Sequence, residues 1–122
     1  MGRKTYDFLP AKFRPLPHRL NVVCSRKPET VDAADGVLVI SSPEDFLRSV
    51  QRGEQRLPSN QLWIIGGEEI YRQTLEHCDE LYLTLVDGEH DGDAYFPEFN
   101  AQFILTEREP HDGYSFCVYR RV

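Results

Sequence analysis

Several features that mark other protein classes are missing from this sequence of 122 residues. The formal net charge is −6, so the chain lacks the basic excess that a general nucleic-acid binder uses to neutralise phosphates. It has no signal peptide, no apolar run long enough to span a bilayer, and no internal repeat or low-complexity segment. These absences favour one domain over residues 1–122, in the cytoplasm, with neither nucleic acid nor membrane as a partner.

Cysteine is scarce as well, with three residues at Cys24, Cys78 and Cys117. Their number is odd, their spacings are wide and no C-x-x-C occurs, so neither a disulfide framework nor a metal site is predicted. Two of them lie in apolar, strand-like runs. Buried, reduced thiols are therefore expected.

What is present is an alternation of strand and helix patterns. Helices are predicted after the N-cap Ser42 and from Glu68 onward. Residues 9–18 contain three prolines and are expected to be irregular, 88–99 form an acidic loop, and 109–113 form a turn-rich link. Strands are predicted at 20–25, 36–41, 61–65, 80–87, 103–108 and 114–121. This order predicts an α/β fold with a largely parallel sheet and an antiparallel C-terminal pair.

The stretch "WIIGGEEIYRQ" places Gly66 and Gly67 between a predicted strand and a predicted helix. Missing Cβ atoms let a ligand approach the main chain closely, and backbone N–H groups at such a junction bind phosphates. Glu68 and Glu69 would repel a phosphate beside their side chains, so cations must come from elsewhere. A tight turn without a ligand is an equal alternative, because a full G-x-G-x-x-G is absent.

Two short basic clusters could supply those cations. The first is "GRKT" at 2–5 and the second is "SRK" at 25–27. Each alone is more often a solvated edge, but together with the glycine pair they make a three-point cradle for a phosphorylated nucleotide. Arg19 is either an ordinary surface cation or a carboxylate clamp at the mouth of an apolar cleft lined by Leu16 and Ile65.

Five segments in this order resemble dihydrofolate reductase: "MGRKTY", "RPLPHRLNVVCSR", "WIIGGEEIYRQTL", "LYLTLVDGEHDGDAYFPEF" and "YSFCVYRR". The resemblance runs along the whole chain. It implies a dihydrofolate-reductase-like, mostly parallel sheet with flanking helices and an antiparallel C-terminal strand. It also implies NADPH-dependent reduction of 7,8-dihydrofolate to tetrahydrofolate, with dihydrofolate as the small-molecule partner. The oligomeric state stays open.

The resemblance also implies roles for single residues, including a cis peptide between the two glycines. Arg19 would hold the substrate's glutamate α-carboxylate, and Ser25 with Arg26 would bind the ribose phosphate of NADPH. The implied cofactor-binding residues are Arg3, Lys4, Thr5, Ser25, Arg26, Ile65, Gly66, Gly67, Glu68, Glu69, Ile70 and Tyr71. The implied substrate-binding residues are Phe13, Leu16, Arg19, Ile65, Tyr71 and Thr84.

Met1 matches a methionine inside the family pattern. The resemblance therefore implies that the family's first strand, active-site loop and first helix, with the acidic residue that helps to protonate the pterin, precede this stretch. No catalytic residue and no metal ligand is assigned within residues 1–122, and turnover by this stretch alone is not expected. Two alternatives stay open: a non-catalytic NADP-binding fragment, and the reductase domain of riboflavin-biosynthesis enzymes, which would not require Arg19.

Overall fold

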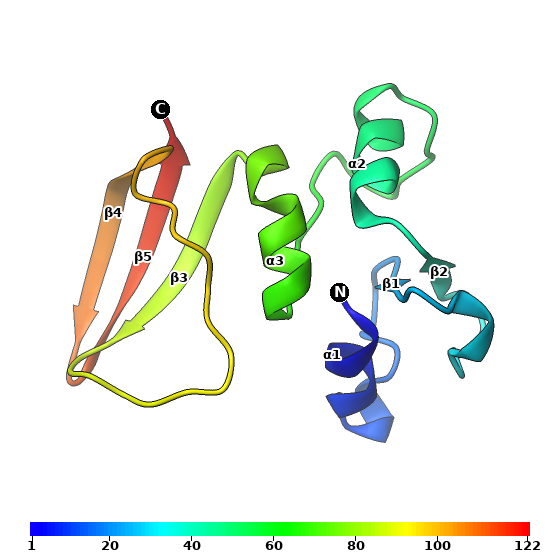
Figure 1. Cartoon of the computed structure of the whole chain (residues 1–122), viewed down its shortest axis with the longest axis horizontal. Helices are drawn as coiled ribbons and strands as arrows, with labels where there is room; N and C mark the ends of the chain where they lie inside the picture. Colours follow the sequence, from blue (N-terminus) through cyan, green and yellow to red (C-terminus); the bar gives the residue numbers. More distant parts are fainter. The chain divides into compact units, whose positions relative to one another are not determined.

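The strands form two separate sheets, one in each of two compact units, Met1–Thr74 and Leu75–Val122 (Figure 1). A computed structural model describes all of residues 1–122. The first sheet is a parallel pair and the second is an antiparallel sheet of three strands. The predicted mixed α/β class is confirmed, although the parallel and antiparallel strands do not join into one sheet. The single domain expected over the chain stays a prediction.

In the first unit the strands are short and the loops are long. β1 (Val22–Cys24) pairs in parallel with β2 (Leu38–Ile40), with Val23 opposite Val39. Both lie inside the predicted ranges. The remaining elements of this unit are α1 (Arg3–Phe8), η1 (Ala11–Phe13), η2 (Pro28–Thr30), α2 (Pro43–Gln51) and α3 (Glu68–Thr74).

Helix α2 begins where the sequence predicts. The Ser42 hydroxyl accepts a hydrogen bond from the backbone N–H of Asp45 at 3.2 Å, and Pro43 occupies the first helical position. This cap satisfies one of the donors that have no partner within the helix. Phe46 is buried beneath the helix. The start from Glu68 is also confirmed for α3, which ends at Thr74 and continues as η3 (Leu75–His77) in the second unit.

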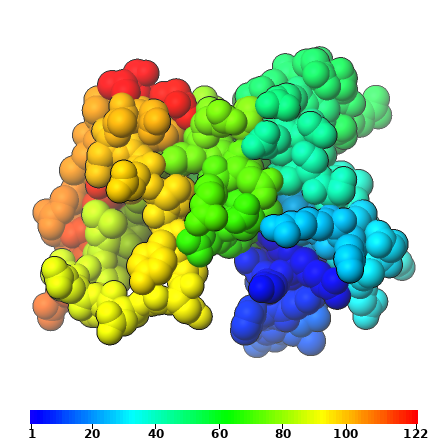
Figure 2. Space-filling view, in the orientation of Figure 1, coloured from blue at the N-terminus to red at the C-terminus, as the bar shows by residue number.

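The N-terminal segment forms a helix that the sequence analysis did not predict. Arg3 and Asp7 pair across one turn of α1 at 3.5 Å, and the chain leaves the helix at Leu9, directly before Pro10. Tyr6 is fully buried, and its hydroxyl accepts a hydrogen bond from Ala34 N–H at 3.2 Å. Figure 2 shows these dark blue N-terminal residues packed against the lighter blue and cyan segment that carries β1 and β2.

The strand predicted at 61–65 is wrong as a strand. The apolar run is present, but these residues belong to neither sheet. β1 and β2 pair with each other, and residues 61–65 pair with neither of them. An apolar run becomes a strand only where a neighbouring backbone supplies the ladder of hydrogen bonds. Here the side chains of the run line a cavity instead.

The second unit is an antiparallel sheet of β3 (Glu80–Val86), β4 (Phe103–His111) and β5 (Tyr114–Arg121), in the sheet order β3-β5-β4, so that the last strand lies between the other two. Leu81, Phe103 and Cys117 are its buried apolar residues. The turn-rich link predicted at 109–113 is wrong for its first part, because 109–111 extend β4 and the turn is confined to 112–113. Pro110 is tolerated because β4 is an edge strand.

Strand β4 contains one extra residue. Its pairing with β5 shifts between Leu105 and Glu107, which leaves Thr106 as a bulge. The Thr106 hydroxyl donates to the Val118 carbonyl at 3.1 Å. Glu107 consequently lies opposite Val118, on the face where Arg120 reaches it at 3.8 Å.

The expectation of reduced cysteines is confirmed. Cys24, Cys78 and Cys117 are all free thiols, and Cys24 and Cys117 are buried in β1 and β5. Separately, none of the helices has the length and apolar character required to cross a bilayer.

Candidate functional site

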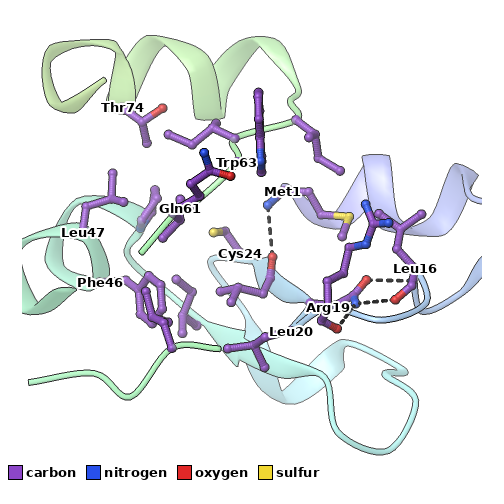
Figure 3. A pocket seen from close by; sticks show the side chains of 18 of the residues that line it. Met1, Leu16, Arg19, Leu20, Cys24, Phe46, Leu47, Gln61, Trp63 and Thr74 are labelled. Atoms are coloured by element: carbon purple, nitrogen blue, oxygen red, sulfur yellow. Dashed lines mark hydrogen bonds between the residues drawn. The ribbon is translucent and has the colours of Figure 1, made fainter. Parts of the chain in front are cut away.

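The first unit encloses a cavity of about 460 Å³ (Figure 3). Its wall is mostly apolar and comes from β1, β2, α2 and the 57–65 segment. Trp63, the single tryptophan of the chain, lies along this wall with 59% of its surface exposed. A pocket with an apolar wall and a few polar groups at its mouth is the usual form of a small-molecule site.

The mouth of the cavity is formed in part by the loop at 14–21, which carries Leu16, His18 and Arg19. The Nε of Arg19 donates to the carbonyl of Pro17 at 2.9 Å, and no protein group pairs with the two terminal nitrogens. The guanidinium therefore keeps its outer edge available for an anion. Ile65 and Ile70 also line the cavity, so the structure brings these two together with Leu16 and Arg19.

Three of the predicted substrate residues lie elsewhere. Phe13 lies on η1, outside the cavity wall, with the Lys12 ammonium 5.0 Å from the centre of its ring. Tyr71 lies on α3, and its ring is 3.5 Å from the position that a Cβ on Gly66 would take. Thr84 belongs to β3 in the second unit.

The glycine pair and the two basic clusters meet at Gly2. The N–H of Gly2 donates to the Gly66 carbonyl at 2.7 Å, and Gly2 forms a parallel bridge with Cys24, the residue before "SRK". A Cβ on Gly2 would lie 3.2 Å from Cγ1 of Ile70, so the Ile70 side chain would have to shift slightly to accept a larger residue there. The three points of the expected cradle are thus held together by backbone contacts.

Within the cradle, some side chains already have a hydrogen-bond partner in the protein and others have none. Arg3 donates to the Thr30 hydroxyl at 2.8 Å, and the Ser25 hydroxyl accepts from the Lys27 N–H at 3.1 Å. Lys4 and Arg26 are exposed and pair with no protein group. Thr5 faces Gly67, with its hydroxyl oxygen 3.7 Å from where a Cβ would lie. Three cations, counting the equally exposed and unpaired Lys27, and the Thr5 hydroxyl therefore remain available for phosphate oxygens.

The acidic residues that follow the glycines share one cation of their own helix. Arg72 contacts Glu68 at 3.0 Å and Glu69 at 2.9 Å, one turn further along α3. Pairing with the guanidinium reduces the repulsion that the two carboxylates would exert on a phosphate near Gly67. Gly66 has a φ of +110°, and the Gly66–Gly67 peptide is cis, as the resemblance implies. Arg14–Pro15 is cis as well.

Comparison with known proteins agrees with this arrangement. The family model described as dihydrofolate reductase matches residues 1–121. The chain is 31% identical to a dihydrofolate reductase of Aedes albopictus, with 100% of this chain and 72% of the relative covered. For those of Heliothis virescens and Bacillus subtilis the identity is 32% in both, with 72% and 70% of the relative covered.

The chain belongs to the dihydrofolate reductase family.

Members of this family are oxidoreductases, and the activity that the family and its named relatives support is NADPH-dependent reduction of dihydrofolate. The two alternatives left open by the sequence, a non-catalytic fragment and a riboflavin-type reductase domain, are not favoured.

The ionisable groups of this dihydrofolate reductase cavity are few. Besides His18 and Arg19, the Met1 amine and the Cys24 thiol line it, and no carboxylate does. Burial lowers the pKa of the Met1 amine, and the nearby Cys24 opposes that shift. Burial raises the pKa of the Cys24 thiol, with an opposing effect from the amine. Both pKa shifts go in the direction that favours the neutral form of the group.

Sequence reasoning missed two residues that line the cavity. Trp63 was assigned to a strand, although its place two residues before Ile65 would have put both side chains on one face. Asn21 was counted as part of a strand, yet its side chain is buried against the loop at 14–21. A polar amide between a proline-rich loop and an apolar run was the signal available for it.

Proposed function

We propose that the Met1–Thr74 unit binds NADPH along the segments that meet at Gly2 and binds dihydrofolate in the cavity beside them. The observation that carries this proposal is the contact of Gly2 with both Gly66 and Cys24, at 2.7 Å in the first case. It brings a backbone without Cβ atoms next to two sets of cations. Such a combination is suited to a dinucleotide with several phosphates.

In this proposal each group of residues has one task. Arg3, Lys4 and Thr5 bind the pyrophosphate side of the cofactor, with Gly66, Gly67 and the start of α3 against the main chain. Ser25 and Arg26 bind the ribose phosphate, because a free guanidinium can hold a phosphate through two parallel hydrogen bonds. Glu68 and Glu69, both paired with Arg72, and the side chains of Ile70 and Tyr71 complete the cofactor side.

On the substrate side, Arg19 holds the carboxylate of the glutamate tail, and Leu16 packs against the aromatic part of the substrate. Its unpaired terminal nitrogens support this role for Arg19. Ile65 flanks both ligands, beside the place where their rings meet. For Phe13, Tyr71 and Thr84, contact with the substrate rests on the family resemblance. NADPH, when bound, supplies the hydride, and the chain contributes orientation of both ligands and an apolar wall that excludes water. The proposed location is the cytoplasm, which the three free thiols support.

The deciding experiment compares NADPH with NADH, which differ by the ribose phosphate. Both are titrated against Trp63 fluorescence, since this residue lines the cavity. Replacing Arg26 with alanine removes a charge-assisted contact, so we expect the Kd for NADPH to rise about 10-fold or more, with the Kd for NADH unchanged.

Arg56→Ala is the matched control, because Arg56 is also exposed and pairs with no protein group. It should leave both dissociation constants unchanged. Equal weakening of NADPH and NADH by Arg26→Ala would contradict the proposed phosphate contact. Dihydrofolate-dependent oxidation of NADPH is the activity to measure beside binding.

A further inference from the structure

We propose that Asn21 is a positioning residue for dihydrofolate: its side-chain amide holds the loop that presents Leu16 and Arg19 to the cavity. The proposal rests on the carboxylate-binding role proposed above for Arg19. Asn21 itself has no task in that proposed function: it lines the cavity, but its side-chain amide is bonded to the loop.

The side-chain amide of Asn21 both accepts and donates hydrogen bonds. Its Oδ1 accepts from the N–H of Leu16 at 2.9 Å, and its Nδ2 donates to the carbonyls of Leu16 at 3.0 Å and Arg19 at 3.1 Å. Both N–H groups of the side-chain amide thus donate hydrogen bonds to the loop. The residue is only 4% exposed, so water cannot replace these bonds without opening the loop.

The same residue connects the loop to the sheet. The carbonyl of Asn21 accepts from the N–H of Leu38 at 2.9 Å, and Leu38 is the first residue of β2. Asn21 also lies directly before β1 in the chain. Asn21 therefore connects the two parts: its side chain binds the loop, and its backbone binds β2 in the cavity wall.

The conformation that Asn21 holds is not a relaxed one. His18, between the two residues bonded by the amide, has a φ of +59°, in the left-handed region that side chains with a Cβ rarely adopt. The bonds to Leu16 and Arg19 lie on either side of it and keep the turn closed. Without them the turn can relax, and the guanidinium of Arg19 would no longer be aimed at one place on the cavity mouth.

Replacing Asn21 with aspartate tests the proposal, because the acceptor remains while both donors are lost and a charge is added near Arg19. We expect the Kd for dihydrofolate, measured by Trp63 fluorescence, to rise about 10-fold, the equivalent of one or two hydrogen bonds. The Kd for NADPH, and that for a pterin without the aminobenzoylglutamate tail, should stay unchanged. Asn100→Asp is the control, since Asn100 is exposed and lies in the second unit.

A double-mutant cycle tests whether Asn21 acts through Arg19. Arg19→Ala removes the proposed clamp, so adding Asn21→Asp to it should weaken dihydrofolate binding no further. Multiplying effects would overturn the proposal, because Asn21 would then contribute independently of Arg19. Equal weakening of dihydrofolate, NADPH and the tailless pterin would overturn it as well, by showing a general loss of structure.

Two further measurements keep the outcomes separable. If Asn21→Asp fails to fold, Asn21→Gln retains the amide but displaces it by one methylene, and the same selective loss is expected. Hydrogen exchange at the Leu16 amide should speed up in either variant, whatever ligand is present. Faster exchange with unchanged dihydrofolate affinity overturns the positioning role alone. No effect of Arg19→Ala on dihydrofolate overturns the proposed clamp and the positioning role with it, while leaving the proposed NADPH contacts intact.

Discussion

In the unit of Leu75–Val122, strands of 7, 9 and 8 residues pair along almost their whole length, whereas in Met1–Thr74 two strands of 3 residues pair with each other. The second unit is ordered by repeated backbone pairing along two pairs of strands, β3 with β5 and β4 with β5. The first is ordered by single residues that tie loops to the short sheet: Tyr6, Asn21 and Gly2. We infer that substitutions at a few positions should disrupt the first unit, while the second should tolerate the loss of any one side chain.

The largest effect should come from Tyr6→Ala in the first unit. The side chain is fully buried and carries the hydrogen bond from Ala34, so its removal leaves a cavity and an unsatisfied donor. We expect a loss of about 3–5 kcal/mol in the free energy of unfolding. Chemical denaturation followed by Trp63 fluorescence measures it. Tyr95→Ala is the control at a site 67% exposed, and a loss in Tyr6→Ala no greater than in this control would break the comparison.

A smaller effect is expected for Gly66→Ala. A φ of +110° is a conformation that residues with a Cβ rarely adopt, and the new methyl would lie 3.5 Å from the Tyr71 ring. We expect a loss of about 1–3 kcal/mol in stability, together with weaker NADPH binding. Both are measured by fluorescence, the first with denaturant and the second by titration.

Gly36→Ala is the matched control for that substitution. Gly36 also has a positive φ, of +83°, but a Cβ there would meet nothing within 4 Å. It should lower stability without changing the Kd for NADPH. If Gly36→Ala weakened NADPH binding as much as Gly66→Ala does, the effect at Gly66 would come from backbone strain in the unit rather than from its place beside the cofactor.

The smallest effect on stability is expected for Tyr82→Phe, in the second unit. The Tyr82 hydroxyl donates to Glu80 at 2.8 Å and, ahead of Arg120, holds the pKa of that carboxyl below its usual value near 4.5. Because the pKa is lowered in the folded state, the ionised carboxylate stabilises the fold at any pH above the usual pKa. This contribution is lost as the pH falls through the lowered pKa of the folded protein. Tyr82→Phe should therefore raise the pKa of Glu80 and leave the sheet intact.

Carbon NMR titration of the Glu80 carboxyl measures that shift directly. Tyr95→Phe should leave the pKa of Glu80 where it is. A large loss of strand structure in Tyr82→Phe would show that the second unit also depends on single side chains, contrary to the comparison above.

The two units also differ in how well their elements could be predicted from the sequence. β3 and β5 were predicted from the sequence to within one residue, because alternating apolar residues and a nearby partner strand agree. The extension of β4 through Pro110 could not be predicted, since it depends on which backbone edge faces solvent. In the first unit the N-cap at Ser42 was readable because capping is local. The failure at 61–65 came from assuming that an apolar run always finds a partner.

The candidate site also has features that could be predicted from the sequence and features that could not. Gly66, Gly67 and the basic clusters could be proposed because glycine and arginine have few structural roles, and the structure brings their backbones together at Gly2. The sequence could not predict which of these side chains already have hydrogen-bond or ion-pair partners within the protein. Arg3 donates to Thr30, and Arg72 pairs with both Glu68 and Glu69; both arrangements depend on geometry across turns and loops.

The bulge at Thr106 makes strand β4 sensitive to parity, the odd or even count of its residues. Because successive side chains alternate between faces, one residue more or less between Leu105 and Glu107 would turn the rest of the strand over. His111 would then leave the aromatic stack with Tyr114 and Phe116, and Glu107 would leave Arg120. A chimera joined within β4 must therefore preserve the residue count across the junction before it preserves any residue's identity.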